Sequence, residues 1–564
     1  MRDINLKTAP YYFSDKQIEK IEKMISSMTL EEKIGQLFFV VGRGFDEEYL
    51  SHVTKDLHVG GIMVRPLNKD TDRAIISYVQ KHSNIPLFVA ANLESGGAGC
   101  CSEGTNVATN MMIGATNDPS NAYELGRICS EEANEIGVNF AFAPVSDIDY
   151  NFRNPIMNTR TFASSVKMVK ECATNYILAS QKNNVMCSAK HFPGDGRDER
   201  DQHLVSSIND LSCEEWDKSY GAIYESEIRA GVLAFMTGHI LLPSYSKRLN
   251  PDLEDKDILP GSLSTELLNG LLREKLGFNG LILTDASTMA GFNIPYPRDY
   301  AVPYSIKAGN DMFLICKNLD EDVMFMKRGY ERNIITEERL HDALLRILAT
   351  KMKIGLLDED FSFLKREPVL RKKENLEVAK RIASDSITLV KEQKGLLPLT
   401  VKKNKRILLH VLESGGNALG YLRTEVGNQF KALLEKEGFD VTPFVSNGTY
   451  EGLQEAFESV KEKYDAIIYL ANLETKSNQT TVRIEWTNPM GVNVPIYINS
   501  IPTIFISLAN PYHLLDVPRV KTYINTYGMN DYTLTCLVDK LLGRDTFRGK
   551  DPVDSFCGKW DTHL

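Results

Sequence analysis

Eight short apolar runs alternate with helical patterns between residues 35 and 315, and this alternation limits the folds open to the chain. Apolar runs of this length are typical of strands buried on both faces, and the segments between them suit helices with one apolar face. The predicted strands are 35–41, 59–64, 86–92, 139–145, 185–189, 232–237, 280–285 and 311–315. The pattern predicts a parallel (β/α)8 barrel, although a doubly wound open sheet is also compatible with it.

Polar residues suited to catalysis or binding follow these predicted strands repeatedly. They are Arg65, Asn92, Glu94, Asp147, Lys190, His191, His239 and Asp285. In a barrel, the carboxyl ends of all strands meet at one face, where enzymes of this architecture carry their chemistry. Each residue alone also has a simpler structural explanation: His239 suits a hydrogen-bonded core histidine, and Glu94 suits a helix cap.

The segment from Val185 to His203 reads VMCSAKHFPGDGRDERDQH and changes from a buried strand to a charged loop. A run of charges alone is typical of a solvated surface loop. Asp201 and His203, however, are two residues apart, and in an extended segment such residues point to the same side. A carboxylate in that position orients and polarises the imidazole, which makes His203 a candidate proton carrier near neutral pH.

Asp285 ends another predicted strand, in GLILTDASTM, and is therefore held rigidly with little water on one side. A fixed carboxylate together with a proton-carrying imidazole suits a double displacement, in which the carboxylate attacks an electrophilic carbon. Glycoside hydrolysis with retention uses these two roles, ordinarily with two carboxyl groups about 5 to 5.5 Å apart. Here His203 would take the place of the second carboxylate.

At 564 residues the chain is too long for one ordinary core, so two domains are expected. We predict a TIM-like barrel domain over 1–355, a linker with a connecting helix over 356–400, and an α/β sandwich domain over 401–564. The second domain has its own alternation of predicted elements. Its strands are 406–411, 439–445, 465–470, 503–507 and 522–527, and its helices are 419–437, 450–463 and 532–542.

The composition limits the classes of partner that the chain is expected to bind. A net charge of -10 argues against broad binding of nucleic acid or anionic membrane, so a small-molecule or neutral polymer substrate is expected. The nine cysteines are scattered and show no zinc spacing. The first residues lack the apolar core of a signal peptide and no run approaches 18 apolar residues, so a cytoplasmic protein is expected. A cluster of Asp195, Asp198, Asp201 and His203 offers carboxylate and imidazole ligands for a cation, but an open, oxygen-rich loop does not enforce a geometry, and we expect no metal and no cofactor.

Several motifs together resemble a known family. In the first half they are MTLEEKIGQ (28–36), GGI (60–62), NLESGG (92–97), FAPVSD (142–147), NTRTF (158–162), KHFPG (190–194), DQH (201–203), PGSLST (from 260), LREKLGFNG (272–280), Thr284-Asp285 and AGND (308–311). In the second half they are AKRIASDSITLVK (379–391), LLPL (396–399), NPY (510–512) and GKDPV (549–553). With these motifs the chain resembles glycoside hydrolase family 3, and within it the β-N-acetylglucosaminidase branch.

The resemblance implies a TIM barrel followed by an α/β sandwich and a retaining exo-β-N-acetylhexosaminidase without a cofactor. It implies Asp285 as the nucleophile and His203 as the acid/base, with Asp201 as its partner. Sugar hydroxyls or the acetamido group would be held by cationic donors. The residues implied or predicted to bind substrate are Asn92, Glu94, Arg160, Lys190, His191 and His239.

Two departures from the family pattern leave alternatives open. Asn92 stands where the family has Asp, which exchanges an acceptor-only anion for an amide and leaves gluco against galacto preference undecided. Asp195 stands where many relatives have His, and we interpret it as exposed. Some members of the branch transfer the sugar to phosphate, and a neutral imidazole repels phosphate less than a carboxylate does, so a phosphorylase is the nearest alternative.

A protein that binds sugar without turnover is a third possibility, which the presence of Asp201, His203 and Asp285 together disfavours. The second domain suits a cap on the barrel, a homodimer contact or a plain scaffold, and its sequence does not choose among them.

Overall fold

The computed structural model describes residues 4–413, 425–445, 456–486 and 491–564, which form two compact units. Unit 1 comprises Met1–Asn106, Ala122–Ile148 and Val169–Leu376. Unit 2 comprises Val107–Asn121, Asp149–Met168 and Glu377–Leu564. Two short segments from the first third of the chain therefore belong to the same unit as the C-terminal region.

Unit 1 is built on an eight-stranded parallel sheet in the order β10-β1-β2-β3-β4-β5-β7-β9. The strands are β1 (Phe38–Val41), β2 (Gly61–Met63), β3 (Phe88–Ala91), β4 (Phe140–Ala141), β5 (Met186–Phe192), β7 (Ala234–Thr237), β9 (Leu281–Thr284) and β10 (Phe313–Leu314). A parallel bridge between Leu283 and Met312 links β9 to the residue before β10 and closes the barrel. The predicted (β/α)8 barrel is confirmed, and the open sheet is not formed.

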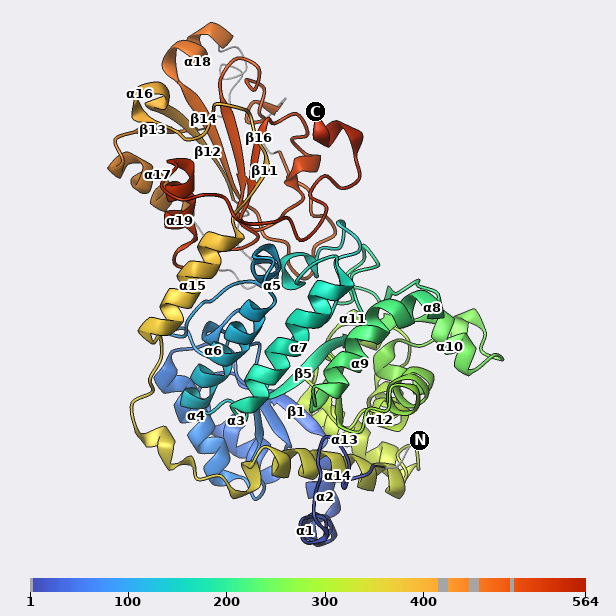
Figure 1. Ribbon diagram of the computed structural model, residues 1–564. Helices are drawn as coiled ribbons and strands as arrows, with labels where there is room; N and C mark the ends of the chain where they lie inside the picture. The colour runs from blue at the N-terminus through green and yellow to red at the C-terminus, as the bar shows by residue number, and fades with distance from the viewer. Residues whose placement is uncertain (1–3, 414–424, 446–455, 487–490) are drawn as a thin grey trace. The chain divides into compact units, whose positions relative to one another are not determined.

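Nearly all barrel strand residues are buried, which explains why they read as continuous apolar runs. Helices surround the strands, among them α4 (Lys69–His82), α6 (Ser120–Ile136), α7 (Val166–Lys182) and α9 (Ala222–Arg229) (Figure 1). The T-x-x-E motif begins α2 (Leu30–Gly35): the Thr29 hydroxyl accepts the Glu32 N–H at 3.2 Å, and the Glu32 carboxylate accepts the Thr29 N–H at 2.9 Å.

Unit 2 contains a six-stranded mixed sheet in the order β11-β16-β15-β14-β12-β13. Its strands are β11 (Thr388–Lys391), β12 (Arg406–Glu413), β13 (Asp440–Pro443), β14 (Ala466–Asn472), β15 (Thr503–Ser507) and β16 (Thr522–Asn525). Helices α17 (Val426–Lys436), α18 (Phe457–Lys463) and α19 (Thr533–Leu541) accompany it. The predicted α/β sandwich is confirmed, while residues 419–424 and 450–455 of two predicted helices lie outside the described residues.

One strand of this sheet was not predicted. β11 lies in the predicted linker and pairs antiparallel with β16, at the edge of a sheet whose other pairs are parallel. Its last three residues are only partly buried, so it lacks the long apolar run by which the other strands were recognised. It continues from α15 (Lys373–Ser386), whose helical pattern extends almost to its first residue.

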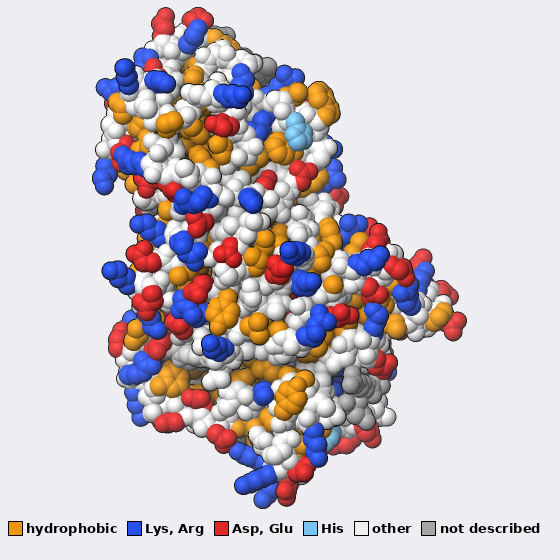
Figure 2. All heavy atoms as spheres, viewed as in Figure 1, with side chains coloured by type: hydrophobic (Ala, Val, Ile, Leu, Met, Phe, Trp, Pro, Cys, Tyr) orange, Lys and Arg blue, Asp and Glu red, His pale blue; other side chains and the backbone are white. Residues whose placement is uncertain are grey.

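The described part of the chain holds no helix with both the length and the apolar character needed to cross a bilayer. On the face that Figure 2 shows, basic and acidic side chains are interspersed and neither sign forms a continuous field. A mixed surface of this kind gives no long-range attraction for a polyanion.

Candidate active site

Asp285 lies directly after β9, at the carboxyl end of the barrel strands, and only 6% of its surface is exposed. Its N–H donates to the Thr237 carbonyl of β7 at 2.8 Å, which fixes the backbone. Oδ1 accepts the Ala286 N–H at 2.7 Å, whereas Oδ2 has no hydrogen-bond partner among the described residues. A rigid carboxylate with one unbonded oxygen suits a nucleophile.

The surroundings of Asp285 keep it ionised. Burial alone would raise the pKa of the carboxyl, but the neighbouring imidazoles, above all that of His191, and the Ala286 N–H outweigh burial and lower the pKa below its usual value. His191 Nε2 lies 3.9 Å from Asp285 Oδ2. Asp285 is therefore available as an anion across the neutral pH range.

Asp147, which follows β4 and is completely buried, holds His191 in position. Asp147 Oδ2 lies 2.7 Å from His191 Nδ1, and the same carboxylate accepts the His191 N–H at 3.2 Å. Its other oxygen accepts the Asp195 N–H at 2.7 Å. Asp147 was noted in the sequence only as a polar residue after a strand, and the structure shows that it orients His191 and the start of the following loop.

Lys190 and Glu94 form a nearly buried ion pair, with Lys190 Nζ 2.7 Å from Glu94 Oε1. They come from the ends of β5 and β3, which supports the predicted convergence of strand ends at one face. Asn92 follows β3 as well, and its side chain is exposed and forms no hydrogen bond with the described residues. These groups offer both donors and acceptors for hydroxyls.

His203 and Asp201 form the predicted pair, with His203 Nδ1 2.6 Å from Asp201 Oδ1. The same carboxylate oxygen accepts the His203 N–H at 2.9 Å. Asp201 is buried, while 25% of the His203 side chain is exposed. The His203 carbonyl accepts the Ala290 N–H at 3.0 Å, which joins the pair to the segment that follows Asp285.

The loop that carries this pair is tied to the barrel by Gln202, a residue that the sequence did not single out. Gln202 Oε1 accepts the His239 N–H at 2.7 Å, and Nε2 donates to Asp195 Oδ2 at 3.3 Å. The sequence feature that could have pointed to Gln202 is that it is an uncharged residue between Asp201 and His203 in a charged loop. The interpretation of Asp195 as exposed is wrong: only 2% of it is exposed, because Asp147, Gln202 and Tyr220 enclose it.

His239 follows β7 and is fully buried, with both ring nitrogens bound by protein groups. Nε2 donates to the Ala286 carbonyl at 3.1 Å, and Nδ1 accepts from the Ser262 hydroxyl at 2.8 Å. Burial lowers the pKa of this imidazole, so it is neutral near pH 7. This arrangement favours the simpler reading of His239 as a residue that holds the Asp285 segment.

Arg160 belongs to unit 2, and the residues described below that hold its loop in place belong to the same unit. Asn110 Nδ2 donates to the Arg160 carbonyl at 2.7 Å. Asn158 Nδ2 donates at 3.2 Å to Asn510 Oδ1, which belongs to the NPY motif of the second half. Two motifs that are about 350 residues apart in the sequence thus build one local structure.

Within the described ranges, no group of three or more His, Cys, Asp and Glu side chains is arranged to hold a metal ion. In the loop from 195 to 203, Arg200 pairs with Asp198 at 2.7 Å and Arg197 pairs with Asp210 at 2.8 Å. The two arginines of the loop thus pair with carboxylates, one inside the loop and one just after it, while its Asp195, Asp201 and Gln202 side chains are buried.

Comparison with known proteins identifies the family of the chain. The model of the glycosyl hydrolase family 3 N terminal domain matches residues 29–350. A β-N-acetylglucosaminidase/β-glucosidase of Cellulomonas fimi is 46% identical over 563 residues, which cover 100% of both chains.

Two solved structures share the whole architecture. A β-glucoside phosphorylase, BglX, is 41% identical with a TM-score of 0.92, over 99% of each chain. A family 3 β-N-acetylglucosaminidase from Paenibacillus sp. str. FPU-7 shares the fold with a TM-score of 0.80 at 24% identity, over 94% of this chain and 99% of that one. The chain belongs to glycosyl hydrolase family 3.

Proposed function

We propose that the protein is a retaining, exo-acting β-glycosidase that releases a terminal β-linked N-acetylglucosamine or glucose through a glycosyl intermediate on Asp285. The observation that carries the proposal is the buried, ionised Asp285 carboxylate, one oxygen of which has no hydrogen-bond partner in the described part of the chain. A carboxylate so placed stabilises the positive charge that develops near C1 and then bonds to that carbon.

His203 moves the proton in both steps. In the first step, Asp285 Oδ2 attacks C1, the glycosidic bond breaks, and His203 gives its Nε2 proton to the departing oxygen. In the second step, water attacks C1, the ester electron pair returns to Asp285, and the proton of water passes to His203. Asp201 holds Nδ1 and stabilises the imidazolium, so that Nε2 faces the reacting groups.

The predicted binding residues divide into two kinds. Asn92, Glu94, Lys190 and His191 present polar atoms at the strand ends and bind sugar hydroxyls in this proposal. Arg160 is assigned to the sugar by the family resemblance, and His239 acts through the backbone of Ala286.

The sugar is proposed from relatives. The Cellulomonas fimi protein is named for both N-acetylglucosaminidase and glucosidase activity. Asn92 donates as well as accepts, so it does not demand one hydroxyl configuration as strictly as a carboxylate does. We expect aryl β-N-acetylglucosaminide and aryl β-glucoside to be cleaved, and the β-N-acetylgalactosaminide to be cleaved more slowly.

Phosphorolysis is the second candidate. It is favoured by the neutral imidazole in place of a second carboxylate, since the imidazole does not repel phosphate, and by the name of the relative BglX, which is 41% identical over 99% of the chain.

Product analysis with the three aryl glycosides, each with and without phosphate, tests both. Free sugar formed at a rate independent of phosphate supports hydrolysis, and a sugar 1-phosphate formed in proportion to phosphate supports phosphorolysis.

Trapping of the intermediate tests the nucleophile. A 2-deoxy-2-fluoro glycoside slows the second step, so mass spectrometry of a digest should find the sugar on the peptide that contains Asp285. Asp285→Asn should remove both the adduct and turnover, by at least about 10³-fold. Retention of full activity in this variant would contradict the nucleophile assignment.

A further inference from the structure

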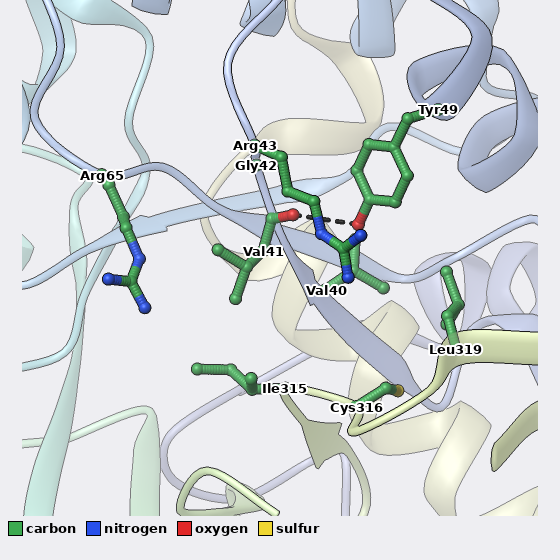
Figure 3. Close-up of a pocket in the computed structure, with 9 residues that line it drawn as sticks. All are labelled: Val40, Val41, Gly42, Arg43, Tyr49, Arg65, Ile315, Cys316 and Leu319. Atoms are coloured by element: carbon green, nitrogen blue, oxygen red, sulfur yellow. Dashed lines mark hydrogen bonds between the residues drawn. The ribbon is translucent and has the colours of Figure 1, made fainter. Parts of the chain in front are cut away.

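A cavity of about 330 Å³ opens beside the ends of β1, β2 and β10 (Figure 3). Val41 ends β1, Arg65 follows β2 by two residues, and Ile315 follows β10 directly. Asp285 likewise follows β9 directly, so the cavity opens at the same end of the barrel as the nucleophile. Its volume lies at the lower end of the range of small-molecule pockets.

The cavity combines an apolar floor with two cationic groups. Arg43 and Arg65 line it together with Val41, Ile315 and Cys316, and none of the described residues around it carries a carboxylate. Within the described ranges neither guanidinium forms an ion pair, and both side chains are exposed. Two unneutralised guanidiniums at the rim of a pocket attract an anionic group, which they can bind through paired donors.

Arg43 is partly oriented before any ligand binds. Its guanidinium lies over the ring of Tyr49, 5.2 Å from the centroid, and the Tyr49 hydroxyl donates to the Val41 carbonyl at 2.9 Å. The ring is thereby fixed to the end of β1, as Figure 3 shows. Preorganisation of this kind lowers the entropy cost of binding.

The wall of the cavity is joined to the catalytic segment. Ile315 has a φ of 54°, an uncommon conformation for a β-branched residue that persists only where the surroundings fix it. Its N–H donates to the Phe39 carbonyl at 2.9 Å, and its carbonyl accepts the Ser287 hydroxyl at 2.6 Å. Ser287 is only two residues from Asp285, at most about 7 Å along the chain.

We propose that this pocket is an anion subsite beside the nucleophile, which holds the phosphate that accepts the sugar or the carboxylate of an anionic leaving group. The inference rests on the proposed function and adds the charge of the second substrate. With dihydrogen phosphate as acceptor, a phosphate oxygen bonds to C1, the bond from C1 to Asp285 breaks with its electron pair on the carboxylate, and the phosphate proton passes to His203. The imidazolium is thereby restored for the next cycle.

The test uses the full chain with Arg43→Gln and Arg65→Gln, singly and together. Arg332→Gln is the matched control, because Arg332 is an exposed arginine just after α13 (Leu319–Glu331), the helix that begins beside the cavity and ends at the other end of the barrel. One arm measures the ratio of sugar 1-phosphate to free sugar as phosphate is raised. The other compares kcat/KM for a carboxylated aryl glycoside with that for its neutral analogue. Calorimetry with inorganic phosphate measures binding without turnover.

In the double variant we expect either the product ratio or the preference for the carboxylated substrate to fall at least about ten-fold, as loss of a charged hydrogen-bonding group implies. The arm that responds identifies phosphate or carboxylate as the ligand, and the control should match the wild type. The subsite is overturned if both ratios and phosphate binding are the same in the wild type and the double variant, or if the wild type shows no phosphate binding and no preference for either anion. Neutral aryl glycosides without phosphate report on the proposed function alone, so the two failures are distinguishable.

Discussion

His203 differs from the other imidazoles of the site in what its ring nitrogens do. His239 has both nitrogens bound by Ser262 and Ala286, and His191 lies between Asp147 and Asp285. Within the described residues, His203 is bound only at Nδ1. Its side chain is also the most exposed of the three. An acid/base needs one nitrogen oriented by the protein and the other open to substrate, and His203 meets both conditions.

We therefore expect His203→Ala to lose about 10²- to 10⁴-fold in kcat with aryl glycosides of poor leaving groups. The loss should be smallest for the most acidic phenols, because these leave without protonation. A series of substituted phenyl glycosides measures this dependence, with the wild type as reference. Equal losses across the series would count against His203 as the acid.

Glu227 is a buried acid beneath the site. It lies on α9, and the Ser146 hydroxyl hydrogen-bonds its carboxyl; the Ser146 N–H in turn donates to the Lys190 carbonyl at 2.7 Å. Burial, opposed in part by the Ser146 hydroxyl, raises the pKa of Glu227 to about 8, so the group is neutral in the folded protein near pH 7.

This raised pKa predicts a pH dependence of stability. Below the ordinary pKa of about 4.3 both states hold the proton and the contribution is fully present. Between that value and about 8 only the folded state holds it, so the contribution is lost as pH rises. Glu227→Gln, which is neutral at every pH, should lose this slope and gain stability over the wild type at pH 8, on the order of a few kcal/mol. Urea unfolding at pH 5 and pH 8 checks it, and identical slopes in both proteins would contradict the assignment.

At the scale of elements, the strands and their ends are what the sequence predicts best. The eight barrel strands coincide with the eight apolar runs, because strands covered on both faces need apolar side chains at every position. The pairing of Asp201 with His203 also follows from local spacing. The sequence did not predict the roles of Asp147 and Gln202. The partner of Asp147 is His191, 44 residues away, and that of Gln202 is His239, 37 residues away, and only the fold brings these residues together.

The loop from Asp195 to His203 depends on Gln202 for its position. Gln202→Met keeps the length of the side chain but removes both of its hydrogen bonds, to His239 and to Asp195. We expect kcat to fall about ten-fold, with the larger loss for poor leaving groups, because His203 is displaced by a fraction of an ångström or more. Arg200→Ala in the same loop is the control, since Arg200 is exposed and pairs with Asp198. A uniform loss across leaving groups would indicate a general effect on stability instead.

At the scale of the whole molecule, the path of the chain matters most. Residues 107–121 and 149–168 precede most of the barrel in the sequence yet belong to unit 2. There Asp149 lies 2.8 Å from the Tyr512 hydroxyl, and Asn530 Nδ2 donates to the Val107 carbonyl at 2.7 Å. The sequence could not reveal this, because both segments carry ordinary apolar and polar residues and their partners lie more than 350 positions away.

A fragment of residues 1–400 tests this organisation together with the domain boundaries proposed from the sequence. The fragment keeps both segments but lacks Asn510, Tyr512 and Asn530, so we expect it to aggregate or to unfold without a cooperative transition. Co-expression with 401–564 should restore a soluble complex. Gel filtration and thermal unfolding decide the matter, and a monomeric fragment with a sharp transition would show that the first 400 residues fold alone.

Because of this interleaved path, residues made early must wait during synthesis for the later residues that they contact in unit 2. The segment 149–168 leaves the ribosome long before its partner Pro552, whose carbonyl accepts the Ser164 N–H at 3.1 Å and which lies 388 residues further along the chain. At about 5 to 20 residues per second, the interval is roughly 20 to 80 s. During that time the segment cannot bury three side chains that are buried in the folded protein, namely Ile156, Met157 and Phe162. We therefore expect the yield of active protein in a cell to depend partly on how well chaperones shield residues 149–168 until Pro552 has emerged.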